Sequence, residues 1–107
     1  MEIILLILTM MTKLYLVHCG FYDPHLADGI YESHTNFFVA GTSFEDARVK
    51  VKEMDGFKER KMHVDGVQEI SVVNGHRVEL HRDPSLAETE NNIVSSRHRD
   101  LAPKKES

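Results

Sequence analysis

The chain has 107 residues, of which 28% are charged and 41% hydrophobic, and its formal net charge is −4 at pH 7. This length supports one domain with a modest core. The mild acidic balance argues against a nucleic-acid partner, because such a protein needs a basic face to neutralise phosphates. The single cysteine, Cys19, excludes an intramolecular disulfide and a four-cysteine zinc site, and it fits a cytoplasmic location.

The first twelve residues contain an apolar run from Ile3 to Leu8. The run is too short to span a bilayer, which takes about 20 apolar residues, so no membrane association is expected. Glu2 stands where a signal peptide would carry a basic residue. We interpret residues 1–12 as a leader that reflects an over-extended gene start, with Met11 as the natural initiator. An ordered extra strand or a dimer contact is the alternative.

Two strands are predicted on either side of a polar loop. Residues 13–19 (KLYLVHC) and 33–40 (SHTNFFVA) are rich in β-branched and aromatic residues, and Gly20 is expected to end the first strand. The loop over residues 20–32 contains Asp-Pro and Asp-Gly turn signals. Alternation in the first strand places Tyr15, Val17 and Cys19 on one face and Leu14, Leu16 and His18 on the other. In the second strand, His34, Asn36 and Phe38 share one face.

A helix is predicted over residues 41–57 (GTSFEDARVKVKEMDGF). Thr42 and Glu45 have the spacing of a capping box, Ser43 is an equally good N-cap, and Gly56 is a plausible C-terminal cap. One apolar stripe should pack on the sheet; it comprises Phe44, Ala47, Val51 and Met54.

A β-hairpin with Asn74-Gly75 at its turn is predicted over residues 67–82. A two-residue turn would pair Val72 with Arg77 and mix apolar and charged residues on both faces. A three-residue loop over 73–75 would pair Val72 with His76 and gather the apolar residues on one face. We therefore predict the longer loop, a type I turn with a bulge and a left-handed Gly75.

The predicted order is strand, strand, helix, strand, strand. The fold class is thus α+β, with a small antiparallel or mixed sheet and one helix packed on one face, over residues 13–82. Residues 83–107 form a polar, flexible tail with room for a short helix over 85–91. The sheet face that lacks a helix predicts a homodimer, because such a face needs a cover.

The polar groups near the loop allow several kinds of chemistry. Cys19 lacks the downstream arginine of a phosphatase loop and is interpreted as a buried small hydrophobe. A metal cluster of His18, His34 and His63 with Asp23, Glu32 or Asp65 would need ligands from distant segments, and no local metal motif exists. The sequence therefore assigns no metal, no cofactor and no catalytic residue. General acid–base chemistry and a purely structural hydrogen-bond network remain as alternatives.

Several segments resemble the domain of unknown function 1543 family of small bacterial proteins. They are LYLVHCGFYD, GIYESHTNFFV, SFEDA and KMHVDGVQEI, and the resemblance runs from Leu14 to Leu80. It implies a bacterial, cytosolic origin and no assigned activity. The family has one or two copies of the domain in a chain, which implies self-association for a single-copy chain. The polar residues in these segments are His18, Asp23, Glu32, His34, Asn36, His63, Asp65 and Gln68.

The leading hypothesis is a ligand-binding or self-associating module. Its ligand would be a small molecule in a polar pocket near the 20–32 loop, with binding residues His18, Asp23, Glu32, His34, Asn36, His63 and Asp65. A second hypothesis is an enzyme that uses His18, His34 or His63 as a general acid/base or a metal ligand. A third is a structural or interaction domain without a ligand.

Overall fold

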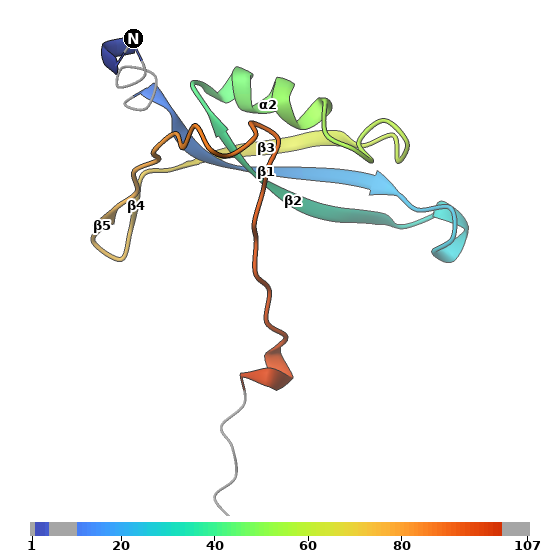
Figure 1. The fold of residues 1–107 in the computed structure, drawn as a ribbon. Helices are drawn as coiled ribbons and strands as arrows, with labels where there is room; N and C mark the ends of the chain where they lie inside the picture. Colours follow the sequence, from blue (N-terminus) through green and yellow to red (C-terminus); the bar gives the residue numbers. More distant parts are fainter. Residues whose placement is uncertain (1, 5–10, 102–107) are drawn as a thin grey trace, which may run out of the picture.

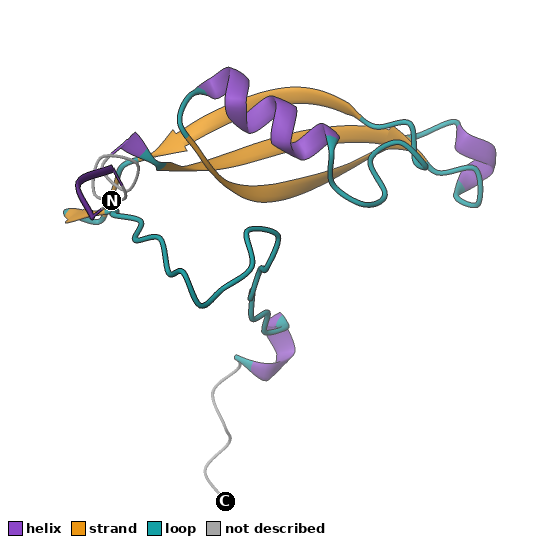
Figure 2. Ribbon diagram, turned by 45° about the horizontal axis from the view of Figure 1, so that its top comes forward, coloured by secondary structure: helices purple, strands orange, loops and turns teal. Residues whose placement is uncertain are grey.

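The fold is a three-stranded antiparallel sheet with one helix on one face (Figure 1). The computed structural model describes residues 2–4 and 11–101. The sheet has the order β2-β1-β3, formed by β1 (Lys13–Tyr22), β2 (Glu32–Gly41) and β3 (His63–Ile70). Helix α2 (Phe44–Lys52) crosses over all three strands (Figure 2). The predicted α+β class and the single covering helix are confirmed.

The first two strands are longer than predicted. β1 continues through Gly20 to Tyr22, and β2 begins at Glu32, so the connecting loop, with the 3-10 helix η1 (Ala27–Gly29), is short. Ten residue pairs join β1 to β2, from the pair Lys13–Gly41 to the pair Tyr22–Glu32, and they contain no register shift. Gly20 was therefore wrongly expected to end the strand.

The pairing of β1 with β3 contains a bulge. His18 lies opposite Gly66 and Cys19 lies opposite Val64, so Asp65 between them has no partner on β1. A bulge redirects the side chain of the extra residue. The shift keeps Val64 and Val67 on the helix side of the sheet, where both pack against the core.

The core lies between the sheet and α2. Tyr15, Val17 and Cys19 are buried, so the predicted core face of the first strand is confirmed. Ala47 and Val51 of α2 are fully buried, whereas Phe44 is 54% exposed. The Phe44 and Tyr15 rings form a T-shaped pair with their centroids 5.4 Å apart. The predicted apolar stripe is thus correct in its centre and wrong at Phe44.

Helix α2 begins with a cap formed by Ser43 and Asp46. The Ser43 hydroxyl accepts a hydrogen bond from the Asp46 amide at 3.0 Å, and Asp46 Oδ2 accepts one from the Thr42 amide at 2.9 Å. The predicted pair of Thr42 and Glu45 is therefore wrong, and Ser43 is the N-cap. The helix ends earlier than predicted, with Glu53 as its C-cap, and Gly56 lies in the turn that follows.

The hairpin forms a separate two-stranded sheet, β4 (Val72–Val73) with β5 (His76–Arg77). Val72 pairs with Arg77, and the turn residues Asn74 and Gly75 both have positive φ, 51° and 78°. These angles define a two-residue type I′ turn, so the predicted three-residue loop with a bulge is wrong, whereas the left-handed Gly75 is confirmed. The register argument failed because it assumed a buried face, and Val72 and Val73 are both exposed.

The end of the described chain packs little against the domain. Every residue from His81 to Leu101 whose burial is described is exposed. The segment 85–91 forms turns, so the short helix expected there is absent, and the 3-10 helix η2 (His98–Asp100) follows. Most of the predicted leader, residues 1 and 5–10, lies outside the described residues. In the described ranges, no helix has the length and apolar character needed to cross a membrane.

Candidate metal centre

Histidines and carboxylates gather on the open face of the sheet, which is the face opposite α2. Alternation along β1 directs Tyr15, Val17 and Cys19 toward the helix, so His18 and Gly20 lie on the open face. In the antiparallel pairing, Asn36 lies opposite His18 and His34 lies opposite Gly20. On the other side of β1, His63 lies opposite Gly20. The three strands thus bring together the predicted residues His18, His34, Asn36 and His63 on one face of the sheet.

Asp65 contacts two histidines, one with each carboxylate oxygen. Its Oδ1 lies 3.0 Å from His63 Nε2, and its Oδ2 lies 3.4 Å from His34 Nδ1. His63 Nε2 also lies 2.9 Å from Glu32 Oε1. We call His18, Glu32, His34, His63 and Asp65 the histidine–carboxylate cluster.

His18 is oriented by its neighbours on β2. Its ring stacks on that of His34, with centroids 4.8 Å apart and planes inclined by 9°. Its Nδ1 lies 2.7 Å from the side-chain oxygen of Asn36. An amide oxygen only accepts hydrogen bonds, so Nδ1 donates and Nε2 of the neutral ring keeps a lone pair. A hydrogen bond of this kind orients most metal-binding histidines.

The cluster contains two sets of three ligand groups that share Asp65. One set is His18, His34 and Asp65, and the other is Glu32, His63 and Asp65; in each set the ligand atoms lie within 4.8 Å of one another. Zinc ligands about 2.0–2.1 Å from the metal at tetrahedral angles stand roughly 3.3 Å apart. The contacts of 2.9 Å and 3.0 Å at His63 and of 3.4 Å at His34 are close to that spacing. These three pairs therefore have a spacing close to that of two ligands of one zinc ion.

Gly20 lies beneath the second of these sets. A Cβ atom at this position would stand 2.7 Å from His63 Nε2 and 2.9 Å from Asp65 Oδ2, and it would also clash with Glu32 Oε1. A side chain at position 20 would therefore fill the space where the three groups meet. Sequence reasoning missed this role because it interpreted the glycine as a strand end, although the strand-like residues Phe21 and Tyr22 follow it.

The cluster is open to solvent, and Cys19 takes no part in it. The side chains of His63 and Asp65 are 49% and 32% exposed, so a ligand can reach them. Cys19 is buried on the helix side of the sheet. Burial, and to a lesser degree the charge of Asp65, raises the pKa of the Cys19 thiol. Since the thiolate is the form that binds metals, Cys19 is a poor ligand.

Asp23 lies apart from the cluster. Its Oδ1 accepts a hydrogen bond from the His25 amide at 2.9 Å, which stabilises the turn after β1. It also lines a separate cavity of about 570 Å³, together with Phe21, Tyr22, Pro24, His25, Glu59, Arg60 and Lys61. The Arg60 guanidinium lies 5.5 Å from the centroid of the Phe21 ring in this region.

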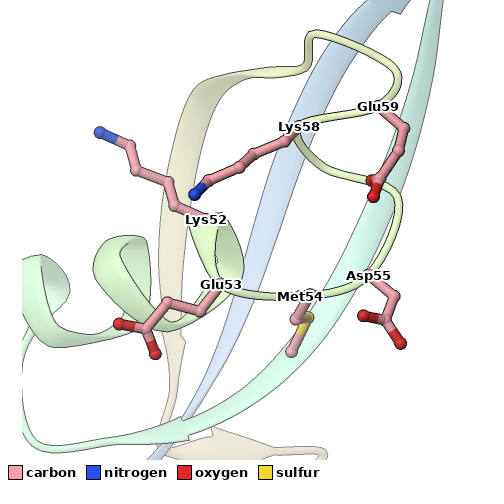
Figure 3. Close-up of a pocket in the computed structure, with 6 residues that line it drawn as sticks. All are labelled: Lys52, Glu53, Met54, Asp55, Lys58 and Glu59. Atoms are coloured by element: carbon pink, nitrogen blue, oxygen red, sulfur yellow. The ribbon is translucent and has the colours of Figure 1, made fainter.

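A second hollow lies just after the end of α2 (Figure 3). It has a volume of about 260 Å³ and is lined by Lys52, Glu53, Met54, Asp55, Lys58 and Glu59. Its charged groups are of both signs, and it contains no histidine. It therefore offers no concentrated charge for a ligand comparable to that of the cluster on the open face.

The chain was compared with protein-family models, with curated proteins and with solved structures, and none of them matches it. The resemblance to the domain of unknown function 1543 family therefore stays a prediction. The function is inferred from the geometry of the cluster.

Proposed function

We propose that this protein binds a divalent transition-metal ion, such as Zn²⁺, at the histidine–carboxylate cluster. The observation that carries this proposal is the convergence of three imidazoles and two carboxylates, supplied by all three strands, on one face of the sheet. Imidazole nitrogen and carboxylate oxygen suit Zn²⁺ and Co²⁺, whereas Ca²⁺ and Mg²⁺ prefer ligands that are all oxygen.

A purely structural network explains the cluster less well. The side chains that form the ion pairs of the cluster are 31–49% exposed. These pairs are His63–Glu32, His63–Asp65 and His34–Asp65. Exposed ion pairs contribute only about 0–1 kcal/mol each to stability. Among the residues that the structure describes, none of the buried ones is polar or charged, so such a network has no buried polar residue to satisfy. The proposal therefore predicts that the cluster serves a ligand.

Calorimetric titration of the chelator-treated protein with Zn²⁺ tests the proposal. The wild-type protein should bind Zn²⁺ at micromolar or lower concentration, and Asp65→Asn should bind at least tenfold more weakly because both ligand sets lose a shared carboxylate. His81→Ala is the matched control, because His81 also stands near a carboxylate but belongs to neither ligand set. Its Nε2 lies 3.8 Å from Glu79 Oε2. Circular dichroism should confirm that both variants fold. Equal Zn²⁺ affinity of Asp65→Asn and wild type would refute the proposal.

Self-association is the second candidate, and the apolar half of the open face favours it. Leu14 pairs with Ile70 and Leu16 with Phe38 on this face, and Phe38 is 47% exposed. We propose that two copies of the protein pack the apolar halves of their open faces against each other in a cytoplasmic homodimer. Sedimentation should then show a dimer that Phe38→Asp dissociates. Val49→Asp is the control, because Val49 is similarly exposed, at 43%, but lies on α2. A wild-type monomer at every concentration would exclude the dimer.

A further inference from the structure

We infer that the histidine–carboxylate cluster holds two metal ions bridged by Asp65. The inference rests on the proposed metal-binding function and extends it from one ion to two. It assigns one ion to Glu32, His63 and Asp65 and the other to His18, His34 and Asp65.

The two oxygens of Asp65 are directed at different histidines. Oδ1 lies 3.0 Å from His63 Nε2, and Oδ2 lies 3.4 Å from His34 Nδ1. A carboxylate in this position can bind one ion with each oxygen. The β-bulge produces the arrangement, because Asp65 is the extra residue of β3 and has no partner on β1.

The ligand groups of the cluster do not form a single set. Within the described ranges, the ligand atoms that lie within 4.8 Å of one another form two sets of three, which meet only at Asp65. Three protein ligands with one open position are typical of a metal site that also binds water or substrate. Paired ions in two-metal sites stand about 3.5–4 Å apart, a separation that a shared carboxylate can span.

The charge of the loaded cluster indicates what its open positions would bind. Two divalent ions bring four positive charges, and only Glu32 and Asp65 supply negative charge among the ligands. The loaded cluster is therefore a net cation when its histidines are neutral. Its open positions would accept an anion, of which hydroxide and inorganic phosphate are the simplest examples.

Native mass spectrometry of the Co²⁺-loaded full chain tests this inference by counting the ions on each chain. Wild type and the His81→Ala control should hold two ions. Glu32→Gln and His18→Ala should each hold one, because each variant removes a ligand from a different set. The electron paramagnetic resonance spectrum of the wild-type protein should show spin coupling between two Co²⁺ ions, and Glu32→Gln should lack it.

The outcomes separate this inference from the proposal on which it rests. One Co²⁺ on the wild-type chain, without spin coupling, would overturn the two-ion site and leave metal binding intact. Loss of all Co²⁺ from both Glu32→Gln and His18→Ala would show that a single ion is bound by ligands from both sets. That result would also overturn the inference. No bound ion on the wild-type chain would overturn both.

Discussion

Gly20 lies directly beneath the carboxylate of Glu32, at the point where β1 passes under the histidine–carboxylate cluster. Any side chain at position 20 would occupy the space in which Glu32, His63 and Asp65 meet. The absence of a Cβ atom thus permits three polar groups from two neighbouring strands to converge over the central strand. A glycine inside a strand often marks such a close approach.

Gly20→Ala should therefore weaken metal binding with little loss of stability. The three displaced groups are the ends of side chains that are 31–49% exposed, which can move away without disturbing the core. We expect at least a tenfold loss of Zn²⁺ affinity in calorimetric titration. Gly66→Ala is the matched control, because Gly66 lies in the adjacent strand and a Cβ there would meet nothing within 4 Å. Equal affinities of the two variants would contradict this role for Gly20.

Cys19 should resist thiol reagents in the folded protein. Its side chain is fully buried, and burial followed by the charge of Asp65 raises its pKa. Labelling with an aromatic disulfide at pH 8 should therefore be slow in buffer and immediate in urea. The pKa of the thiol is thus higher in the folded than in the unfolded protein, so the unfolded thiol loses its proton first as the pH rises. The contribution of Cys19 to the free energy of unfolding should therefore fall above about pH 8.5. Fast labelling of the folded protein would contradict the buried position.

Local patterns predicted most of the fold. Alternation along the first strand correctly separated Tyr15, Val17 and Cys19 from His18, because a sheet with one covered face must bury one set of residues. Helical spacing also identified Ala47 and Val51 as core residues. Phe44 was wrongly placed in the core: it is 54% exposed, although its ring contacts the Tyr15 ring in a T-shaped arrangement.

The candidate site was predictable in its residues but not in its geometry. Alternation assigns a face to each residue within one strand, so grouping His18 with His34 required the further assumption that the first two strands are neighbours, which the pairing of β1 with β2 meets. The bulge at Asp65 and the role of Gly20 depend on contacts between β1 and β3, which are distant in sequence and leave no local signal. Asp23 was grouped with the cluster only because of its place in the loop, and it forms a local turn instead.

Gly75→Ala should open the hairpin and leave the main sheet intact. Gly75 has a φ of 78°, and an alanine there costs about 1 kcal/mol. The β4–β5 pair is exposed and forms its own sheet, so the effect should remain local. The Val78 amide, which donates to the Ser71 carbonyl at 2.9 Å, should exchange its hydrogen several-fold faster. Asn74→Gly keeps a residue that tolerates positive φ and should behave like wild type.

Removal of residues 83–107 should leave the melting temperature nearly unchanged. The residues of this segment whose burial is described are all exposed, and changes at such positions usually alter stability by less than about 0.5 kcal/mol. The shift should be under about 4 °C for a domain of this size. Calorimetry of the shortened and full-length chains provides the measurement, and a larger decrease would show that the segment packs against the domain.

Asp46→Ala should destabilise α2 in a pH-dependent manner. The hydrogen bond from the Thr42 amide, and next the Lys50 ammonium, lower the pKa of Asp46, and partial burial opposes them. This lowered pKa stabilises the fold above about pH 3.9, and the contribution is lost as the pH falls through the folded pKa. We expect a loss of about 1 kcal/mol in urea unfolding at pH 7, typical of a helix cap, and a smaller loss near pH 3. Glu45→Ala removes a carboxylate in the same turn that forms an ion pair with Arg48, and it should cost less at pH 7. Equal losses for the two variants would show that Asp46 does not cap the helix.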